Sequence, residues 1–228
     1  MQKMIILSGA GMSAESGIKT FRDQNGLWQN HDVMEVASPQ GWRKDRSLVL
    51  EFYNQRRAQL KEVEPNSGHF TIAELEGSYD VQVITQNVDD LHERAGSSKV
   101  LHLHGELRKA RSSMDPTLIY DWHEDIKIGD KCDKGSQLRP HIVWFGEAVP
   151  MIETAAMMLM DAEIVVIVGT SMQVYPAAGL VAYAPGNASI YYVDPNPSIN
   201  YELKQLPNLQ VIKAPATEGL VQLKRQLM

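Results

Sequence analysis

The sequence has little cysteine, no long apolar run and no concentrated positive charge. Among its 228 residues there is a single cysteine, Cys132, which excludes an intramolecular disulfide and agrees with a reducing compartment. No apolar run approaches the length of a membrane-spanning helix, and the apolar part of residues 1–7 is too short for a signal peptide. We therefore predict a cytoplasmic protein that does not enter a membrane.

The charge and composition are those of an ordinary globular protein. The formal net charge is −6 and lysine and arginine form no block, which argues against a nucleic-acid partner. Hydrophobic residues make up 43% of the chain and charged residues 22%, and there is no internal repeat or low-complexity segment. The length suits one large domain with a smaller insert, and we expect a monomer.

The stretch Met4–Asp23, MIILSGAGMSAESGIKTFRD, has the pattern of a strand, a glycine turn and the first turn of a helix. The apolar run 4–7 is typical of a buried parallel strand, and Gly9 and Gly11 suit a tight turn that a pyrophosphate can approach. Ala14 stands where the third small residue of the dinucleotide fingerprint belongs. Backbone N–H groups and the helix N-terminus would favour an anion there. An ordinary turn without a ligand is the alternative.

One feature of a standard dinucleotide fold is missing. Such a fold has a second strand that ends in an acid about 20 residues further on, yet residues 28–39 show no strand pattern. Asp194, which follows a later strand, is a candidate for this ribose ligand, although an Asp before a Pro often only forms a turn. Residues 20–23 place an aromatic ring and a guanidinium where they could fold back over a dinucleotide. The pattern predicts a modified dinucleotide fold.

Strand and helix patterns alternate along the rest of the chain and predict an α/β fold. Residues 108–139 have no clear periodicity and are expected to form an irregular excursion. Ser38 is the expected N-cap of a helix that begins at Pro39. Further strands are expected at 79–85, 100–104, 163–168, 189–193 and 211–212, and helices at 47–63, 68–75, 154–160 and 217–227.

Polar residues follow four of the expected strands. A parallel sheet would bring these residues together at one rim, where open α/β sheets bind their ligands. They are residues 9–13, 86–89, 169–171 and Asp194.

His102 and His104 are two residues apart on an expected strand, so they share a face. They leave three alternatives open: one packed and one solvated histidine, a metal-binding pair, or a general base. No third metal ligand stands at a recognisable spacing. Gly105 would let a ligand approach His104 closely.

Five motifs in order resemble the sirtuins, the NAD-dependent protein lysine deacylases: GAGMSAESGIKTFRD, QNVDDLHERAG, LHLHGEL, RPHIVWFGE and GTSMQVYPAAGLV. The resemblance covers nearly the whole chain. It implies a Rossmann-type large domain with a parallel sheet, made of residues 1–27, 78–107 and 144–228. It also implies a smaller domain of residues 28–77, a helical insert, and residues 108–143, a zinc-ribbon-like module.

The resemblance further implies a reaction in which NAD is consumed. In the family, the acyl-lysine carbonyl oxygen attacks the nicotinamide ribose, nicotinamide leaves, and the histidine of the HG pair, here His104, is the base. Asn87 and Asp89 would hold the nicotinamide end, which makes Asn87 a second catalytic candidate. The residues implied to contact NAD are Gly9, Ala10, Gly11, Ala14, Glu15, Thr20, Phe21, Arg22, Trp28, Gln86, Asn87, Asp89, Gly169, Thr170, Ser171, Asp194 and Ala216. The residues implied to clamp the substrate peptide as an added strand are Val143, Phe145, Gly146 and Val174.

The chain departs from the family in two places. Most sirtuins bind a structural zinc with two cysteine pairs in the module, whereas here Ser112 and Ser113 stand near the first pair and Cys132 alone near the second. One thiolate cannot build such a site, so we expect no zinc and no other metal. Asp194 stands where the family usually has Asn, but a carboxylate can also accept hydrogen bonds from ribose hydroxyls. The residues expected to hold the module by packing are Ile119, Tyr120, Trp122 and Ile126.

The sequence Phe52-Tyr53-Asn54-Gln55-Arg56 matches the Tyr-x-x-Arg pattern of class III sirtuins, which favour succinyl-, malonyl- or glutaryl-lysine. Tyr53 and Arg56 share a helix face, and a guanidinium pairs well with a carboxylate. Without the resemblance, Arg56 beside Arg57 is typical of a solvated helix face. The resemblance implies instead that Tyr53 and Arg56 recognise an acidic acyl group.

We therefore predict an NAD-dependent deacylase of acylated-lysine proteins, mainly a desuccinylase or demalonylase with some deacetylase activity. Its products would be nicotinamide and O-acyl-ADP-ribose. The alternatives are a general deacetylase, a protein mono-ADP-ribosyltransferase, a non-catalytic NAD-sensing module, and a metal-dependent hydrolase that uses His102 and His104.

Overall fold

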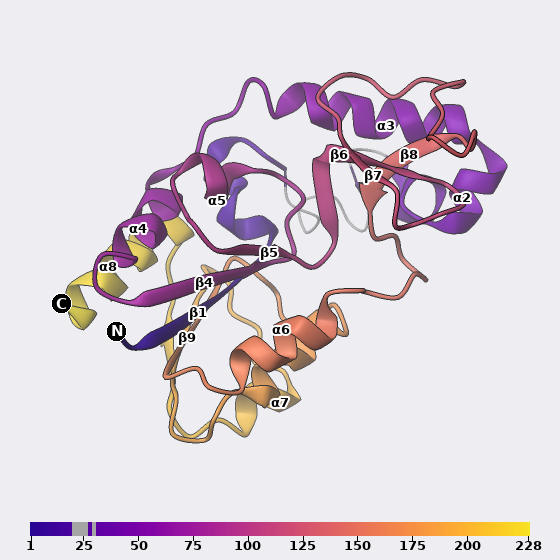
Figure 1. Ribbon diagram of the computed structural model, residues 1–228. Helices are drawn as coiled ribbons and strands as arrows, with labels where there is room; N and C mark the ends of the chain where they lie inside the picture. Colours follow the sequence, from indigo (N-terminus) through magenta and orange to yellow (C-terminus); the bar gives the residue numbers. More distant parts are fainter. Residues whose placement is uncertain (20–26, 29–30) are drawn as a thin grey trace.

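A sheet of six parallel strands in the spatial order β11-β10-β9-β1-β4-β5 forms the centre of the molecule (Figure 1). The computed structural model describes residues 1–19, 27–28 and 31–228. When these strands are numbered one to six in chain order and read from β5, the order is the 3-2-1-4-5-6 arrangement of doubly wound dinucleotide-binding sheets. This order confirms the predicted fold class. The strands are β1 (Lys3–Ser8), β4 (Asp80–Thr85), β5 (Val100–His102), β9 (Ile164–Val168), β10 (Ser189–Val193) and β11 (Leu209–Ile212).

Helices cover both faces of this sheet, so β1 is buried on both sides. Met4 and Ile6 face the core formed with α4 (Ser67–Leu75) and α8 (Ala216–Leu227). Ile5 and Leu7 face the opposite core. That core is completed by α6 (Ile152–Leu159), η4 (Ala177–Tyr183) and α7 (Tyr201–Lys204).

A second, smaller core lies beside the sheet, between three helices and an antiparallel sheet of order β7-β6-β8 (Figure 1). Its helices are α1 (Val33–Val36), α2 (Pro39–Lys44) and α3 (Arg46–Gln59). Its strands are β6 (Gly105–Ser112), β7 (Ile119–Asp121) and β8 (Leu138–Ile142). Trp42, Phe52 and Leu107 are among the side chains buried in it. The residue boundaries of the two domains stay a prediction.

The remaining elements connect these layers. The short helix α5 (Leu91–Arg94) lies between β4 and β5. The turns η1 (Ala10–Met12) and η2 (Ala14–Ser16) follow β1, and β2 (Leu27–Trp28) pairs with β3 (His31–Asp32). No helix among the described residues is both long and apolar enough to span a membrane.

Local capping follows the sequence closely. Ser38 Oγ accepts a hydrogen bond from Gly41 N at 2.9 Å and caps α2, as predicted. Asp45 does the same for α3 through Leu48 N at 2.9 Å, so the chain turns sharply between the two helices.

Two structural expectations were wrong. Residues 108–139 are not an irregular excursion, because β6 extends into them and β7 and β8 lie in or overlap them. A register shift between Glu106 and Ala110 interrupts the two-residue alternation of β6, and polar Ser112 is buried, which hides the strand in the sequence. The stretch 28–39 also contains strand residues, in the β2–β3 pair.

Candidate functional site

The loops that follow β1 and β9 are fastened together at the point where the strand order reverses. Gly9 N donates to Val168 O at 3.1 Å, and Gly11 N donates to Gly169 O at 2.7 Å. A Cβ on Gly9 would lie 2.7 Å from Thr170 Cβ, and one on Gly11 would lie 2.8 Å from Gly169 Cα. These glycines are therefore required by the contact between the two loops, at the place where doubly wound sheets bind dinucleotides.

The turn after the glycines differs from the expected helix. It consists of η1 and η2, each of three residues, which do not build the macrodipole of a long helix. Ala10 and Ala14 are exposed in it. Glu15 accepts from Thr217 Oγ1 at 2.7 Å and Thr217 N at 3.1 Å, so its carboxylate lies at the N-terminus of α8, next to buried Ala216.

Three buried polar side chains meet beneath this turn. Ser13 Oγ donates to Asp89 Oδ2 at 2.9 Å and accepts from Asn87 Nδ2 at 3.1 Å. Gln86 Nε2 donates to Thr170 Oγ1 at 3.1 Å and so links the loops that follow β4 and β9. The predicted residues Asn87 and Asp89 are thus brought together with Ser13, which belongs to the 9–13 cluster that was predicted to lie at the same rim.

The burial of Asp89 disfavours the charged form of its carboxyl group. Its side chain is 6% exposed, and burial raises its pKa from 3.8 to about 6, against the opposing hydrogen bonds from Ser13 Oγ and Leu91 N. With the neighbouring Asn87 amide, this carboxyl group offers both acceptors and a donor, which is the set that a carboxamide such as that of nicotinamide requires. The residues present therefore fit the nicotinamide end of NAD.

A second layer of buried polar groups supports Asn87. Thr85 Oγ1 accepts from Asn87 N at 3.0 Å and from Ser8 Oγ at 2.8 Å, while Ser8 Oγ contacts His92 Nε2 at 2.9 Å. Burial lowers the pKa of His92 well below its usual value, so the ring is neutral. The sequence signal for this layer was a hydroxyl at the end of each of two apolar strands.

The two histidines of the LHLHG motif are held differently. His104 Nδ1 contacts Gln86 O at 3.0 Å, so Nδ1 is the protonated nitrogen and Nε2 keeps its lone pair. Burial lowers the pKa of His104, which keeps it neutral at neutral pH. A neutral imidazole with a free Nε2 lone pair could accept a proton, and the role of His104 as a general base stays a prediction.

His102 contacts acceptors through both ring nitrogens, Asn87 O at 3.0 Å and Glu93 Oε1 at 2.7 Å. Burial acts to lower its pKa, but the hydrogen bond and charge of Glu93 outweigh burial and raise it. A protonated His102 cannot accept a proton. In the described part of the chain, no three His, Cys, Asp or Glu side chains are grouped so that they could hold a metal ion. The absence of bound metal stays a prediction.

Asp194 lies directly after β10 with its side chain 4% exposed. Its Oδ1 accepts from Asn196 N at 2.8 Å, which is the turn-forming contact expected of an Asp before a Pro. Thr170 and Ser171 follow β9 on the neighbouring strand, so the structure places all three at the same rim. Whether Asp194 also binds a ribose stays a prediction.

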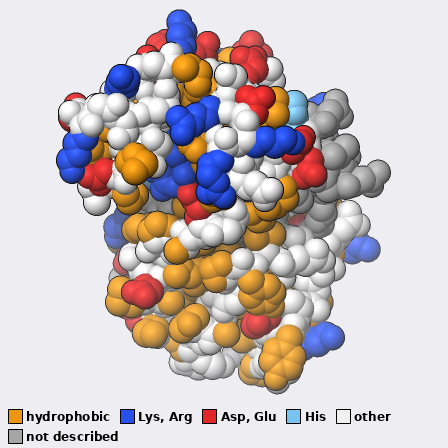
Figure 2. Space-filling view, turned by 90° about the vertical axis from the view of Figure 1, so that its right-hand side faces the viewer, with side chains coloured by type: hydrophobic (Ala, Val, Ile, Leu, Met, Phe, Trp, Pro, Cys, Tyr) orange, Lys and Arg blue, Asp and Glu red, His pale blue; other side chains and the backbone are white. Residues whose placement is uncertain are grey.

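The predicted peptide segment follows β8. Val143 N donates to His104 O at 2.8 Å, and Phe145 N donates to Ala37 O at 3.0 Å. Phe145 and Val174 are exposed apolar side chains at 43% and 39%, and Gly146 has a φ of +87°. In the view of Figure 2, hydrophobic side chains gather in the lower half of the molecule and charged ones in the upper half.

Tyr53 and Arg56 are both buried on α3, at 0% and 5% exposure. The expectation of a solvated face was wrong for Arg57 as well, which is 1% exposed and donates to Leu107 O at 2.9 Å and Asn54 Oδ1 at 2.8 Å. Helix α3 packs against β6, whose Leu107 carbonyl Arg57 reaches, so long polar side chains on that side of the helix are covered.

The module with the lone cysteine is held mainly as expected. Cys132 is 5% exposed and its Sγ donates to Ser112 Oγ at 3.3 Å. Ile126 is buried in the small-domain core, with Tyr120 and Trp122 packed against it, whereas Ile119 is 45% exposed and was predicted wrongly.

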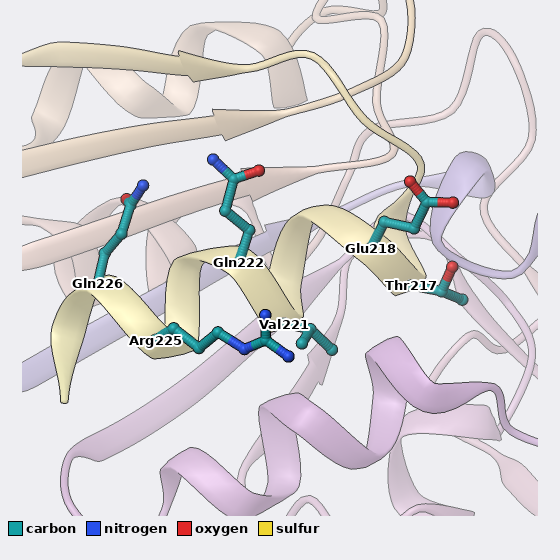
Figure 3. Close-up of a pocket in the computed structure, with 6 residues that line it drawn as sticks. All are labelled: Thr217, Glu218, Val221, Gln222, Arg225 and Gln226. Carbon is teal, nitrogen blue, oxygen red and sulfur yellow. The ribbon is translucent and has the colours of Figure 1, made fainter.

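Some predicted residues lie elsewhere. Thr20, Phe21 and Arg22 are outside the described residues, and of Trp28 only the backbone, in β2, is described. A hollow along α8 contains none of the predicted residues and is not part of the site (Figure 3). It is lined by Thr217, Glu218, Val221, Gln222, Arg225 and Gln226.

The geometry can be compared with known proteins. The model of the Sir2 family matches residues 9–176. The chain is 56% identical to an NAD-dependent protein deacylase of Helicobacter pylori (strain ATCC 700392 / 26695), over 100% of this chain and 98% of the relative. It is 52% identical to an NAD-dependent protein deacylase of Bacteroides thetaiotaomicron, over 100% of this chain and 99% of the relative.

Solved structures agree with this match. A mutant Sir2 homologue–ADP-ribose complex is 37% identical with a TM-score of 0.89, and covers 99% of this chain and 91% of its own. A Sir2 homologue–NAD complex is 38% identical with a TM-score of 0.87, and covers 99% and 89%. The chain belongs to the Sir2 family.

Proposed function

We propose that this Sir2-family protein uses NAD to remove acyl groups from the lysines of other proteins, and that it prefers acidic short acyl groups such as succinyl. Protein deacylation with NAD follows from the family and from the names of its full-length relatives. Our proposal adds to this the preference for acidic acyl groups and the products nicotinamide and O-acyl-ADP-ribose.

His104 is the proposed base. With Nδ1 bonded to Gln86 O, its Nε2 can take a proton from the nicotinamide ribose, whose anomeric carbon NAD supplies as the electrophile when bound. Asn87 and Asp89 would hold the nicotinamide amide, and Gln86 the adjoining ribose. The hydrogen bonds that Asn87 and Asp89 make with Ser13 and Thr85 keep these groups in place without a ligand, so little ordering is needed when NAD binds.

The observation that supports the acyl preference is the connection between His104 and α3. The segment 143–147 is bonded to His104 O through Val143 N, and Trp144 of the same segment donates to Tyr53 Oη at 3.1 Å. An acyl-lysine that lies along this segment with its carbonyl near His104 would extend its acyl end toward Tyr53 and Arg56.

Arg56 has the charge needed to bind a carboxylate there. Its guanidinium lies 3.2 Å from the centre of the Phe52 ring and donates to Phe52 O, which fixes its orientation. Burial lowers its pKa to about 10, and the neighbouring Tyr53 opposes this, so Arg56 remains charged at neutral pH. A buried charge of this kind is worth most when a ligand carboxylate pairs with it.

The experiment is turnover on matched acetyl- and succinyl-lysine peptides with and without NAD, with products identified by mass spectrometry. Arg56→Met should lower desuccinylation by about 30- to several-thousand-fold, because losing one partner of a buried charge pair costs about 2–5 kcal/mol. Deacetylation should be spared, since an acetyl group has no carboxylate.

The matched control is Arg43→Met, the same change at an exposed position of α2, which should alter neither activity. Arg57 cannot act as this control because its side chain is buried and bonded. Equal loss of both activities in Arg56→Met would show that Arg56 supports the fold instead. ADP-ribosylated protein in place of free lysine would favour the transferase alternative.

A further inference from the structure

Trp144 connects the segment beside His104 with helix α3. Its indole Nε1 donates to Tyr53 Oη at 3.1 Å, and the two side chains are 2% and 0% exposed. The flanking Val143 is half-buried and Phe145 is exposed, so successive side chains alternate between the interior and the surface. Trp144 therefore points into the small-domain core while its neighbours face the proposed peptide site.

The direction of this hydrogen bond constrains Tyr53. An indole N–H can only donate, so the Tyr53 oxygen accepts, and its own proton must point away from Trp144. Burial raises the pKa of Tyr53 above its usual value, so the hydroxyl keeps that proton across the neutral range. Tyr53 is thereby a donor of fixed direction on the helix face that it shares with Arg56.

The indole is itself held firmly. The Arg139 guanidinium lies 3.2 Å from the centre of the Trp144 ring, and Trp42 packs against it at 5.7 Å between ring centres. Glu147 accepts from Trp144 N at 2.9 Å, from Arg139 Nη1 at 2.8 Å and from Arg111 Nη2 at 3.0 Å. One carboxylate thus fixes both the backbone of Trp144 and the cation on its ring.

We propose that Trp144 is a positioning residue for acyl-group selectivity, whose indole N–H directs the Tyr53 hydroxyl proton toward the carboxylate of an acidic acyl-lysine. This inference rests on the proposed preference for acidic acyl groups. Because Trp144 acts through Tyr53, its contribution is present for a succinyl group and absent for an acetyl group, which has no carboxylate to receive the proton.

A double-mutant cycle tests the inference, with the succinyl-to-acetyl ratio of kcat/KM as the readout. Trp144→Phe should lower this ratio about three- to tenfold, the effect of one lost neutral hydrogen bond. In a Tyr53→Phe background the same substitution should leave the ratio unchanged, because the acceptor is already gone. A loss of packing alone would affect both backgrounds.

Trp122→Phe is the matched control, since it removes another indole N–H, which donates to Asp125 O, without touching the Trp144–Tyr53 hydrogen bond, and the ratio should not change. If Trp144→Phe does not fold, 3-benzothienylalanine at position 144 keeps the shape and removes only the N–H. An equal fall in both backgrounds would overturn the inference, as would an unchanged ratio in Trp144→Phe when Tyr53→Phe lowers it. If the unaltered protein does not favour succinyl and Tyr53→Phe has no effect on the ratio, the proposed function fails with it.

Discussion

Asp89→Asn should stabilise the protein at neutral pH, because it removes a buried charge without changing the size of the side chain. Burial raises the pKa of Asp89 from 3.8 to about 6. A carboxyl group with a raised pKa in the folded state binds its proton more tightly there than in the unfolded state. The unaltered protein therefore loses stability as the pH rises from about 4 through 6. A shift of about 2 units corresponds to about 3 kcal/mol in full.

Urea unfolding of both proteins without NAD, at pH 4.5 and pH 8, measures how much the buried Asp89 carboxylate destabilises the fold. At pH 4.5 the unaltered protein has already lost about 1 kcal/mol of the roughly 3 kcal/mol. Between pH 4.5 and pH 8, its unfolding free energy should therefore fall by about 2 kcal/mol relative to that of Asp89→Asn. An Asn cannot accept from both Ser13 Oγ and Leu91 N as the carboxylate does, which costs about 1 kcal/mol at either pH. That cost cancels when the two pH values are compared.

The control is Asp133→Asn, the same change of side chain at an exposed position. Identical pH profiles for Asp89→Asn and the unaltered protein would refute the reasoning, because the buried carboxyl would then titrate normally. If Asp89 also binds the nicotinamide end as proposed, the stabilised variant should release nicotinamide more slowly. Stability and turnover would then change in opposite directions.

Three further predictions concern the base, the cofactor and the metal. His104→Ala should reduce deacylation by about 10²- to 10⁴-fold, while the NAD affinity measured by calorimetry stays nearly unchanged. His102→Ala should reduce deacylation far less. If the His102 variant were the inactive one, the assignment of His104 as the base would be wrong. NADP should be a poor co-substrate, because the Asp194 carboxylate would repel a 2′-phosphate, and equal turnover with NAD and NADP would show that Asp194 does not face the ribose. The protein should contain no stoichiometric zinc and keep its fold and activity in strong chelator; one zinc per chain by elemental analysis would contradict the inference drawn from the lone Cys132.

Much of the fold could be predicted because the signals were strong and local. The short apolar runs of β1 and β9, each followed by glycine, are typical of buried parallel strands, and Ser38 before Pro39 is typical of a helix start. The strand β6 was missed because its register shift breaks the alternation on which such a prediction depends. Arg57 was misplaced because its burial depends on the packing of α3 against β6, where Leu107 O accepts its hydrogen bond, and no local pattern reveals that contact.

Site residues could be predicted where they follow a strand and belong to a recognisable motif. Contacts between residues far apart in the sequence could not be predicted. Asn87 and Asp89 follow a strand and belong to a recognisable motif, so their position at the rim was expected. Ser13 was expected at the same rim, but its hydrogen bonds to both residues span more than seventy positions of the chain and no local pattern specifies them. The link from Trp144 to Tyr53 is likewise a product of tertiary structure, because it joins residues 91 apart.

The contact between Glu15 and Thr217 affects how the protein folds during its synthesis. It joins residues 202 apart, so the turn that follows the first strand is completed by the last helix. During synthesis that turn is made early, yet it lacks this partner until the C-terminal helix has left the ribosome. A nascent chain that lacks α8 should therefore be unable to make this contact, and the turn reaches its finished form only after α8 has been synthesised.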